Sequence, residues 1–195
     1  MSALAKIRTA WDAFWFRKVP PHSLAAFRIL FGLYLLAYFL RFAPNVELSF
    51  SNHGVYAPFL VPEAGLPPFW AWTLYLVTLL VITAFILGFQ TTFATPVLLG
   101  FFLYYYFLNF AVRDTAFDRL NLIFLATLCF AQLDRAWSLG GGRRARQDQD
   151  GLVSIWPIRI ITLQIAFLYF GAGFWKLVSP PWHSGAMLRW TLAGP

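Results

Sequence analysis

The run LAAFRILFGLYLLAYFLRFA, residues 24–43, decides the class of fold. As a helix it would extend about 30 Å, which is the thickness of the hydrocarbon core of a membrane. No small-residue cleavage site follows it, so we interpret it as a retained anchor and not as a signal peptide. The sequence therefore predicts a membrane helix at this position.

The composition of the whole chain agrees with this interpretation. Of its 195 residues, 59% are apolar, 20% are aromatic and only 12% are charged, whereas a soluble domain carries about 25% charged residues. Cys129 is the one cysteine in the sequence, so no disulfide can form within the chain. These values exclude a soluble domain, a disordered chain and a disulfide-stapled secreted fold.

Four further apolar runs follow, at residues 69–89, 96–112, 120–133 and 158–178. The run at 120–133 is short and needs residues 115–119 to reach the usual minimum of about 17 residues. We predict an all-α, polytopic transmembrane helix bundle with about five spans. Apolar residues at helical spacing also predict an N-terminal helix lying at the membrane interface: Leu4, Ile7, Trp11, Phe14 and Trp15.

The basic residues predict the orientation of the chain. They precede the first run and follow the fourth, whereas residues 44–68 contain Glu47 and Glu63 and no lysine or arginine. Cytoplasmic loops carry the excess of basic residues, so we expect the N-terminus in the cytoplasm and the C-terminal end outside, in the periplasm or a lumen. Because the basic residues lie next to the apolar runs, we expect the net charge of +7 to interact with membrane lipids and not with nucleic acid.

These boundaries predict one transmembrane domain over residues 1–195. Residues 1–23 form its interfacial segment, 44–68 an external loop, 135–157 a basic cytoplasmic loop and 179–195 an external C-terminal segment.

Lys176 is the most informative polar residue, because an ionisable group inside a membrane is costly and usually faces a cavity or a partner. It follows the small residues Gly171, Ala172 and Gly173, and it shares a helical face with Tyr169. Three interpretations remain open from the residues alone. The side chain faces a cavity and acts as a general base through its neutral amine, or its ammonium group pairs with Asp118 or Asp114, or the ammonium group reaches the headgroups.

The predicted topology brings further polar residues to the same outer side. They form a candidate substrate or lipid cavity together with Tyr169 and Gly173, and they are Asn109, Asp118, Arg119 and Asn121. At the inner side, Arg28 lies about one turn inside the first run, where it could pair with Asp134 or reach phosphate. We predict a structural role for Arg28 and Asp134. The sequence has no metal-spaced set of histidine and cysteine residues.

Two motifs resemble a known family. PHSLAAFRILFG, residues 21–32, is similar to the opening of the HTTM domain, which vitamin K-dependent gamma-carboxylase shares with many bacterial proteins. YFGAGFWKL, residues 169–177, followed by Trp182 and by Gly185-Ala186-Met187, resembles the carboxylase segment whose lysine is the base. The resemblance covers most of the chain.

The resemblance implies a role for Lys176, which matches the lysine that deprotonates a reduced quinone in the carboxylase. It also implies an outward-facing site and a quinone as the possible cofactor. The chain stops at Pro195, before the family's later helices and large lumenal domain, and this implies a short member or a fragment. Trp175 replaces the lysine that precedes the base, which also argues against glutamate carboxylation.

Two functions follow as hypotheses. In the first, the protein binds or acts on a quinone-like or other lipid molecule in a polar cavity around Lys176. In the second, it is a non-catalytic accessory subunit that packs against a larger membrane complex, of respiratory or photosynthetic type, and stabilises its assembly.

Overall fold

The computed structural model describes residues 3–53, 65–108, 115–140 and 151–193. Its long elements are helices, which confirms the predicted all-α fold. Among the described residues, four helical segments are long and apolar enough to cross a membrane: His22–Phe50, Pro68–Leu87, Thr91–Leu108 and Trp156–Val178.

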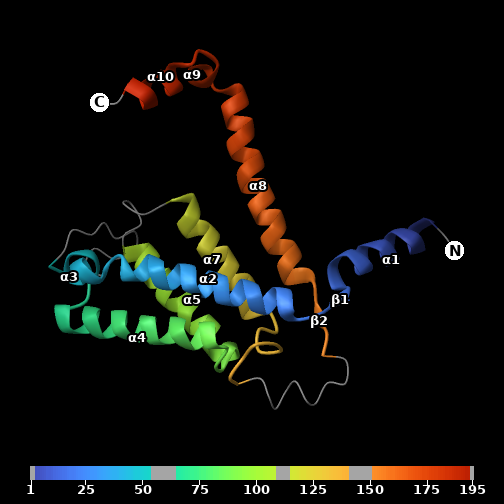
Figure 1. The fold of residues 1–195 in the computed structure, drawn as a ribbon, viewed down its shortest axis with the longest axis horizontal. Coiled ribbons are helices and arrows are strands. Elements are labelled where there is room, and N and C mark those ends of the chain that lie inside the picture. The colour runs from blue at the N-terminus through green and yellow to red at the C-terminus, as the bar shows by residue number, and fades with distance from the viewer. Residues whose placement is uncertain (1–2, 54–64, 109–114, 141–150, 194–195) are drawn as a thin grey trace. The chain divides into compact units, whose positions relative to one another are not determined.

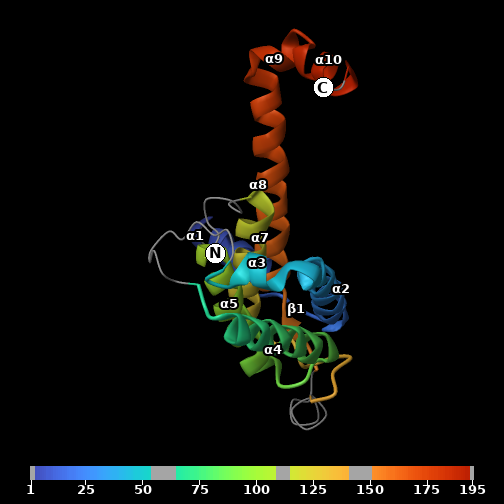
Figure 2. The same ribbon diagram turned by 90° about the vertical axis from the view of Figure 1, so that its left-hand side faces the viewer.

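Four helices pack together in the first part of the chain. They are α2 (His22–Leu40), α4 (Pro68–Leu87), α5 (Thr91–Leu108) and α7 (Ala116–Cys129). Contacts join α2 to α4, α4 to α5, and α5 to α7, and Figure 1 and the turned view in Figure 2 both show α2 and α4 side by side. Side chains of α2 also meet α7, where the Phe124 ring lies 5.6 Å from those of Phe27 and Phe31.

Close packing at Gly32 joins α2 to α4. A Cβ atom at this position would lie 2.5 Å from Cγ1 of Ile86, so only glycine allows the two helices to approach this closely. Around it, Leu35, Ile82 and Phe85 have no exposed surface. Helices in lipid gain little from the hydrophobic effect, so van der Waals packing of this kind is what holds the bundle together.

The fourth predicted run, residues 120–133, corresponds to α7, which has 14 residues and a length of about 21 Å. It ends at Cys129 and not at residue 133, as the apolar pattern had predicted. The chain leaves the helix there because the carbonyl groups of Leu133, Ala136 and Trp137 turn toward the guanidinium group of Arg28. The tertiary contact thus shortens the helix.

Short elements connect the bundle. After α2 come the 3₁₀ turn η1 (Ala43–Asn45) and α3 (Val46–Phe50), which packs on α4. Strand β1 (Lys18–Val19) pairs antiparallel with β2 (Val153–Ser154), with Lys18 opposite Ser154 and Val19 opposite Val153. Two-residue strands are too short to show an alternating pattern, so the sequence did not predict them.

Helix α1 (Ala3–Phe16) forms where the sequence predicted the interfacial helix. Leu4 is 78% exposed, Ile7 65% and Trp11 62%. An apolar helix face with this exposure is the kind that inserts into the boundary between headgroups and acyl chains. Its position on a membrane stays a prediction.

The chain divides into two compact units, Met1–Pro157 and Ile158–Pro195. The second contains most of α8 (Trp156–Val178), followed by α9 (Pro180–His183) and α10 (Ala186–Ala193). Helices α9 and α10 contact each other, and the His183 ring lies against the carbonyl group of Leu177. The prediction of one domain over the chain stays a prediction.

Candidate functional site

The start of α7 presents a buried carboxylate. Thr115 is the N-cap of this helix, and its hydroxyl oxygen accepts a hydrogen bond of 3.2 Å from the backbone N–H of Asp118. The same hydroxyl group donates to Oδ2 of Asp118 at 2.6 Å. An acidic side chain in the first helical turn also interacts favourably with the helix dipole. Contacts within the first turn of α7 therefore fix the position of the Asp118 carboxylate independently of any other helix.

Helix α2 supplies the second partner of this carboxylate. The hydroxyl group of Tyr38 donates to Oδ1 of Asp118 at 2.8 Å, and Asp118 is only 4% exposed. Each carboxylate oxygen thus receives one hydrogen bond, and each can accept at least one more. A buried acceptor of this kind can recognise a ligand that carries a hydroxyl or N–H group.

A second polar pair lies one turn further into the bundle. Nδ2 of Asn121 donates to the hydroxyl oxygen of Tyr34 at 3.3 Å. Tyr34 and Tyr38 are four residues apart, and Asp118 and Asn121 are three apart, so each pair shares one helical face. The two faces meet and form a polar cluster between α2 and α7, which we call the Asp118 cluster: Tyr34, Tyr38, Thr115, Asp118 and Asn121.

A cavity of about 500 Å³ adjoins this cluster. Its lining combines the carboxylate with aromatic and cationic groups: Tyr34, Ala37, Tyr38, Arg41, Phe42, Thr115, Phe117 and Asp118. The guanidinium group of Arg41 lies 5.3 Å from the ring centre of Tyr38 and 5.0 Å from that of Phe42. This volume is within the usual range for small-molecule sites, and the lining suits a flat, partly polar ligand.

The other predicted residues of the outer cavity lie in different places. Arg119 is exposed on α7, one residue after Asp118. Asn109 and Asp114 lie outside the described residues. Tyr169 and Gly173 lie on α8, in the second unit.

Lys176 is in the last turn of α8 and also belongs to the second unit. Its Nζ atom lies 4.7 Å from the ring centre of Trp182, which is on α9. A cation over the face of an indole ring is stabilised by the ring's quadrupole. Within its own unit, Lys176 therefore has an aromatic partner, and its role as a base stays a prediction.

Arg28 lies toward the opposite end of α2 and has no exposed surface. Its guanidinium group donates to the carbonyl oxygens of Leu133, Ala136 and Trp137. The charge of Asp134, in the same segment, acts on this group. The residue is thus held by the backbone of residues 133–137.

Sequence reasoning named Asp118 and Asn121 but missed Thr115, Tyr34, Tyr38 and Arg41. One signal was available, because Thr115 and Asp118 have the Ser/Thr-x-x-Asp/Glu spacing of a helix N-terminus that precedes an apolar run. The tyrosines give no such signal within an aromatic-rich span. In the described part of the chain, no group of three or more histidine, cysteine, aspartate or glutamate residues could hold a metal ion.

The apolar helices and the buried polar cluster together define an integral membrane protein of the polytopic helical class. The family model of the HTTM domain matches residues 16–193. The chain therefore belongs to the HTTM domain family, as its two sequence motifs predicted. Searches of curated proteins and of solved structures found no match.

Proposed function

We propose that this HTTM-domain protein binds a quinone-like or other lipid molecule in the cavity beside the Asp118 cluster. The observation that carries the proposal is the Asp118 carboxylate, which is buried, held by Thr115 and Tyr38, and adjoins a cavity of about 500 Å³. A buried charge inside a membrane protein is costly, and such residues commonly mark a ligand or proton pathway.

The residues present fit a hydroxylated aromatic ring. Asp118 would accept a hydrogen bond from a ring hydroxyl group, while Phe42, Phe117 and Tyr38 offer faces for the ring. Arg41, at the same cavity, would stabilise negative charge that develops on a ligand oxygen. A reduced quinone, when bound, would supply an acidic hydroxyl group and an oxidisable ring. The protein's part is to bind it, orient it and remove a proton.

Lys176 is our candidate for the group that removes the proton, on the strength of its match to the lysine of the carboxylase. A lysine acts as a base only through its neutral amine, so the step requires Lys176 without its proton. The outer placement follows from the basic-residue asymmetry and remains a proposal. Glutamate carboxylation is not part of the proposal, because Trp175 stands where the carboxylase has a second lysine.

Binding is tested with a short-chain hydroquinone, titrated into the full chain in detergent and followed by tryptophan fluorescence. Asp118→Asn should weaken binding by about tenfold or more, because a hydrogen bond to a charged group contributes about 1.5–3 kcal/mol. The matched control is Asp12→Asn, which removes the same charge from α1. Equal affinities of the wild type and Asp118→Asn would overturn the proposal.

Catalysis is tested separately with Lys176→Met, which keeps the apolar stem and removes the charge. If Lys176 is the base, oxidation of the hydroquinone by oxygen should fall by about a hundredfold or more, with binding and folding unchanged. The control is Lys6→Met on α1. A variant that oxidises the hydroquinone at the wild-type rate would exclude Lys176 as the base. Absence of binding in the wild type, with retention in a larger complex in mild detergent, would support the accessory-subunit hypothesis instead.

A further inference from the structure

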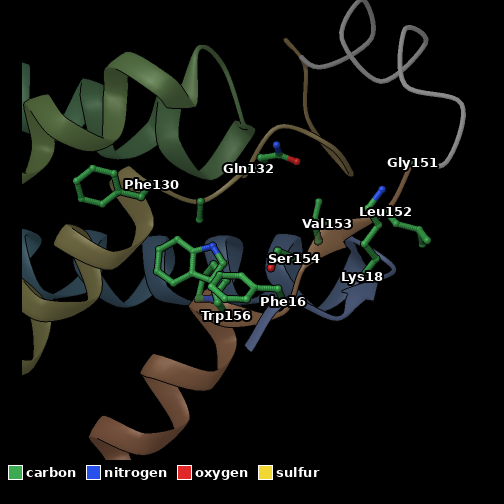
Figure 3. A pocket seen from close by; sticks show the side chains of 11 residues that line it. Phe16, Lys18, Phe130, Gln132, Gly151, Leu152, Val153, Ser154 and Trp156 are labelled. Carbon is green, nitrogen blue, oxygen red and sulfur yellow. The ribbon is translucent and has the colours of Figure 1, made fainter. Parts of the chain in front are cut away.

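A second cavity, of about 430 Å³, lies where β1 and β2 pair, beyond the end of α7. Figure 3 shows Phe16 and Trp156 on one side of it and Gln132 on the opposite side. Phe130 stands at one end, and Lys18 lies beside Leu152 at the other. All of these residues belong to the first unit of the chain. This cavity is separate from the Asp118 cluster, with which it shares no lining residue.

Three polar side chains of this cavity, those of Gln132, Ser154 and Trp156, have no hydrogen-bond partner among the described residues. The side chains of Gln132 and Trp156 make no hydrogen bond within the described part of the chain. The Oγ atom of Ser154 is buried and has no hydrogen-bond partner among the described residues. A buried polar atom without a partner costs about 1–3 kcal/mol. Such an arrangement is stabilised when a ligand with acceptor oxygens enters.

The charge around the cavity is positive. Lys18 lines it, and among the residues that the structure describes no acidic side chain does. In the first unit, the described segments that precede α2 and connect α7 to β2 carry five basic residues and two acidic ones: Lys6, Arg8, Arg17, Lys18 and Arg135 against Asp12 and Asp134. An anion is therefore the favoured ligand.

The surroundings of the cavity favour an anion that is attached to a lipid. Phe130 is 79% exposed and Phe16 is 61% exposed, and both stand at the cavity. Phe16 also ends α1, whose apolar residues are exposed along its length. Exposed aromatic side chains beside basic and polar groups are typical of the level at which phospholipid headgroups lie. A soluble phosphate would make no use of these aromatic groups.

We propose that this cavity binds the headgroup of an anionic phospholipid. The Lys18 ammonium group attracts the phosphate, and the N–H groups of Gln132 and Trp156 donate to its oxygens. Ser154 lies in the wall of the cavity and donates to the same acceptors after a small rotation of its hydroxyl group. Phe16 and Phe130 contact the glycerol backbone and the first methylene groups of the acyl chains.

Native mass spectrometry of the full chain tests this site, with phosphatidylglycerol and phosphatidylcholine of identical acyl chains as probes. The wild type should retain phosphatidylglycerol about tenfold better. Lys18→Gln should remove most of this preference, whereas the matched control Lys6→Gln on α1 should keep it. The general attraction between a basic residue and an anionic lipid surface changes binding about fivefold for any basic residue near the membrane. If Lys18→Gln and Lys6→Gln lowered the retention of phosphatidylglycerol equally, the proposal of a defined headgroup site would be overturned.

Gln132→Leu removes donor groups without changing the charge. It should lower retention of phosphatidylglycerol by about three- to tenfold, as expected for the loss of one hydrogen bond. Gln132 is exposed and in a loop, so this variant is suited to test the proposal if Lys18→Gln fails to fold. Unchanged retention in Gln132→Leu would overturn the proposal. Binding of inorganic phosphate, with no preference between the two lipids, would overturn the assignment to a lipid headgroup.

Discussion

The two ends of α2 use polar side chains in opposite ways. Near its start, Arg28 is buried and directs its donors to three backbone carbonyl oxygens of residues 133–137. Near its end, Tyr34 and Tyr38 meet the side chains of Asn121 and Asp118 beside a cavity of about 500 Å³. Both ends join α2 to α7 or to the segment that follows it. Only at the second end does a side chain, the Asp118 carboxylate, keep the capacity to accept a further hydrogen bond beside a cavity.

The two ends differ in the role of their polar groups: Arg28 has a structural role, whereas the Asp118 carboxylate is a candidate for ligand binding. Backbone carbonyl groups cannot rotate away, so Arg28 forms a fixed connection between two segments that are far apart in sequence. Side-chain partners at the Asp118 cluster can exchange one hydrogen bond for another at little cost when a ligand enters. A polar residue in a membrane span is thus informative only when its partners are known.

The largest expected effect is that of Arg28→Leu. The substitution leaves the carbonyl oxygens of Leu133, Ala136 and Trp137 without their donor, at about 1 kcal/mol each, so the free energy of unfolding should fall by about 3 kcal/mol. Thermal and denaturant unfolding in detergent measure it.

The matched control for this prediction is Arg41→Leu, the same substitution at the exposed, opposite end of α2. It removes contacts with the rings of Tyr38 and Phe42 and should cost about 0.5–1 kcal/mol. If the two arginine variants lost equal stability, the distinction between the two ends of α2 would fail.

Gly88→Ala should have the next largest effect. Gly88 ends α4 with a φ of 71°, and a Cβ atom there would collide with Ser138 and with the guanidinium group of Arg28. The left-handed conformation alone costs a residue with a side chain about 1–2 kcal/mol. We therefore expect the free energy of unfolding to fall by about 2 kcal/mol.

Gly100→Ala is the control for this glycine. It lies inside α5, and no atom lies within 4 Å of a Cβ atom placed on it. Because alanine favours the helix, stability should be unchanged or should rise by up to about 1 kcal/mol. A loss in both variants would point to a general intolerance of larger residues and not to the contact with Arg28.

The smallest effects concern the two tyrosines of the Asp118 cluster. Tyr38→Phe removes a 2.8 Å hydrogen bond to a carboxylate and should cost about 1.5 kcal/mol. Tyr34→Phe removes a 3.3 Å bond from an amide group at a side chain that is 43% exposed, and should cost about 0.5 kcal/mol. Unfolding in detergent measures the loss of stability in each variant. A larger loss in Tyr34→Phe than in Tyr38→Phe would contradict the central place of Asp118 in the cluster.

Much of the fold could be predicted from the sequence, because the membrane imposes a simple physical requirement. Backbone groups in lipid must bond within their own helix, so a long apolar run has no alternative to a helix. The runs beginning at residues 24, 69, 96 and 158 therefore appear as α2, α4, α5 and α8. The run at residues 120–133 was the shortest, and its helix ends early because residues 133–137 bind Arg28.

The candidate site could be predicted only in part. Asp118 and Asn121 were recognisable because polar residues are costly at the end of an apolar run. Their partners were not recognisable, since Tyr38 lies 80 residues before Asp118, and Tyr34 lies 87 residues before Asn121. Helical spacing shows which residues share a face, but not which helix that face meets.

The sequence by itself therefore determined that this is a helical membrane protein of the HTTM family, because apolar length and local motifs are properties of neighbouring residues. Only the tertiary structure decided that Arg28 is held by backbone carbonyl groups and that Asp118 adjoins a cavity. It also brought Lys18, Gln132 and Ser154 to one pocket. Each of these arrangements joins segments that are distant in sequence, and their contacts depend on how the helices pack.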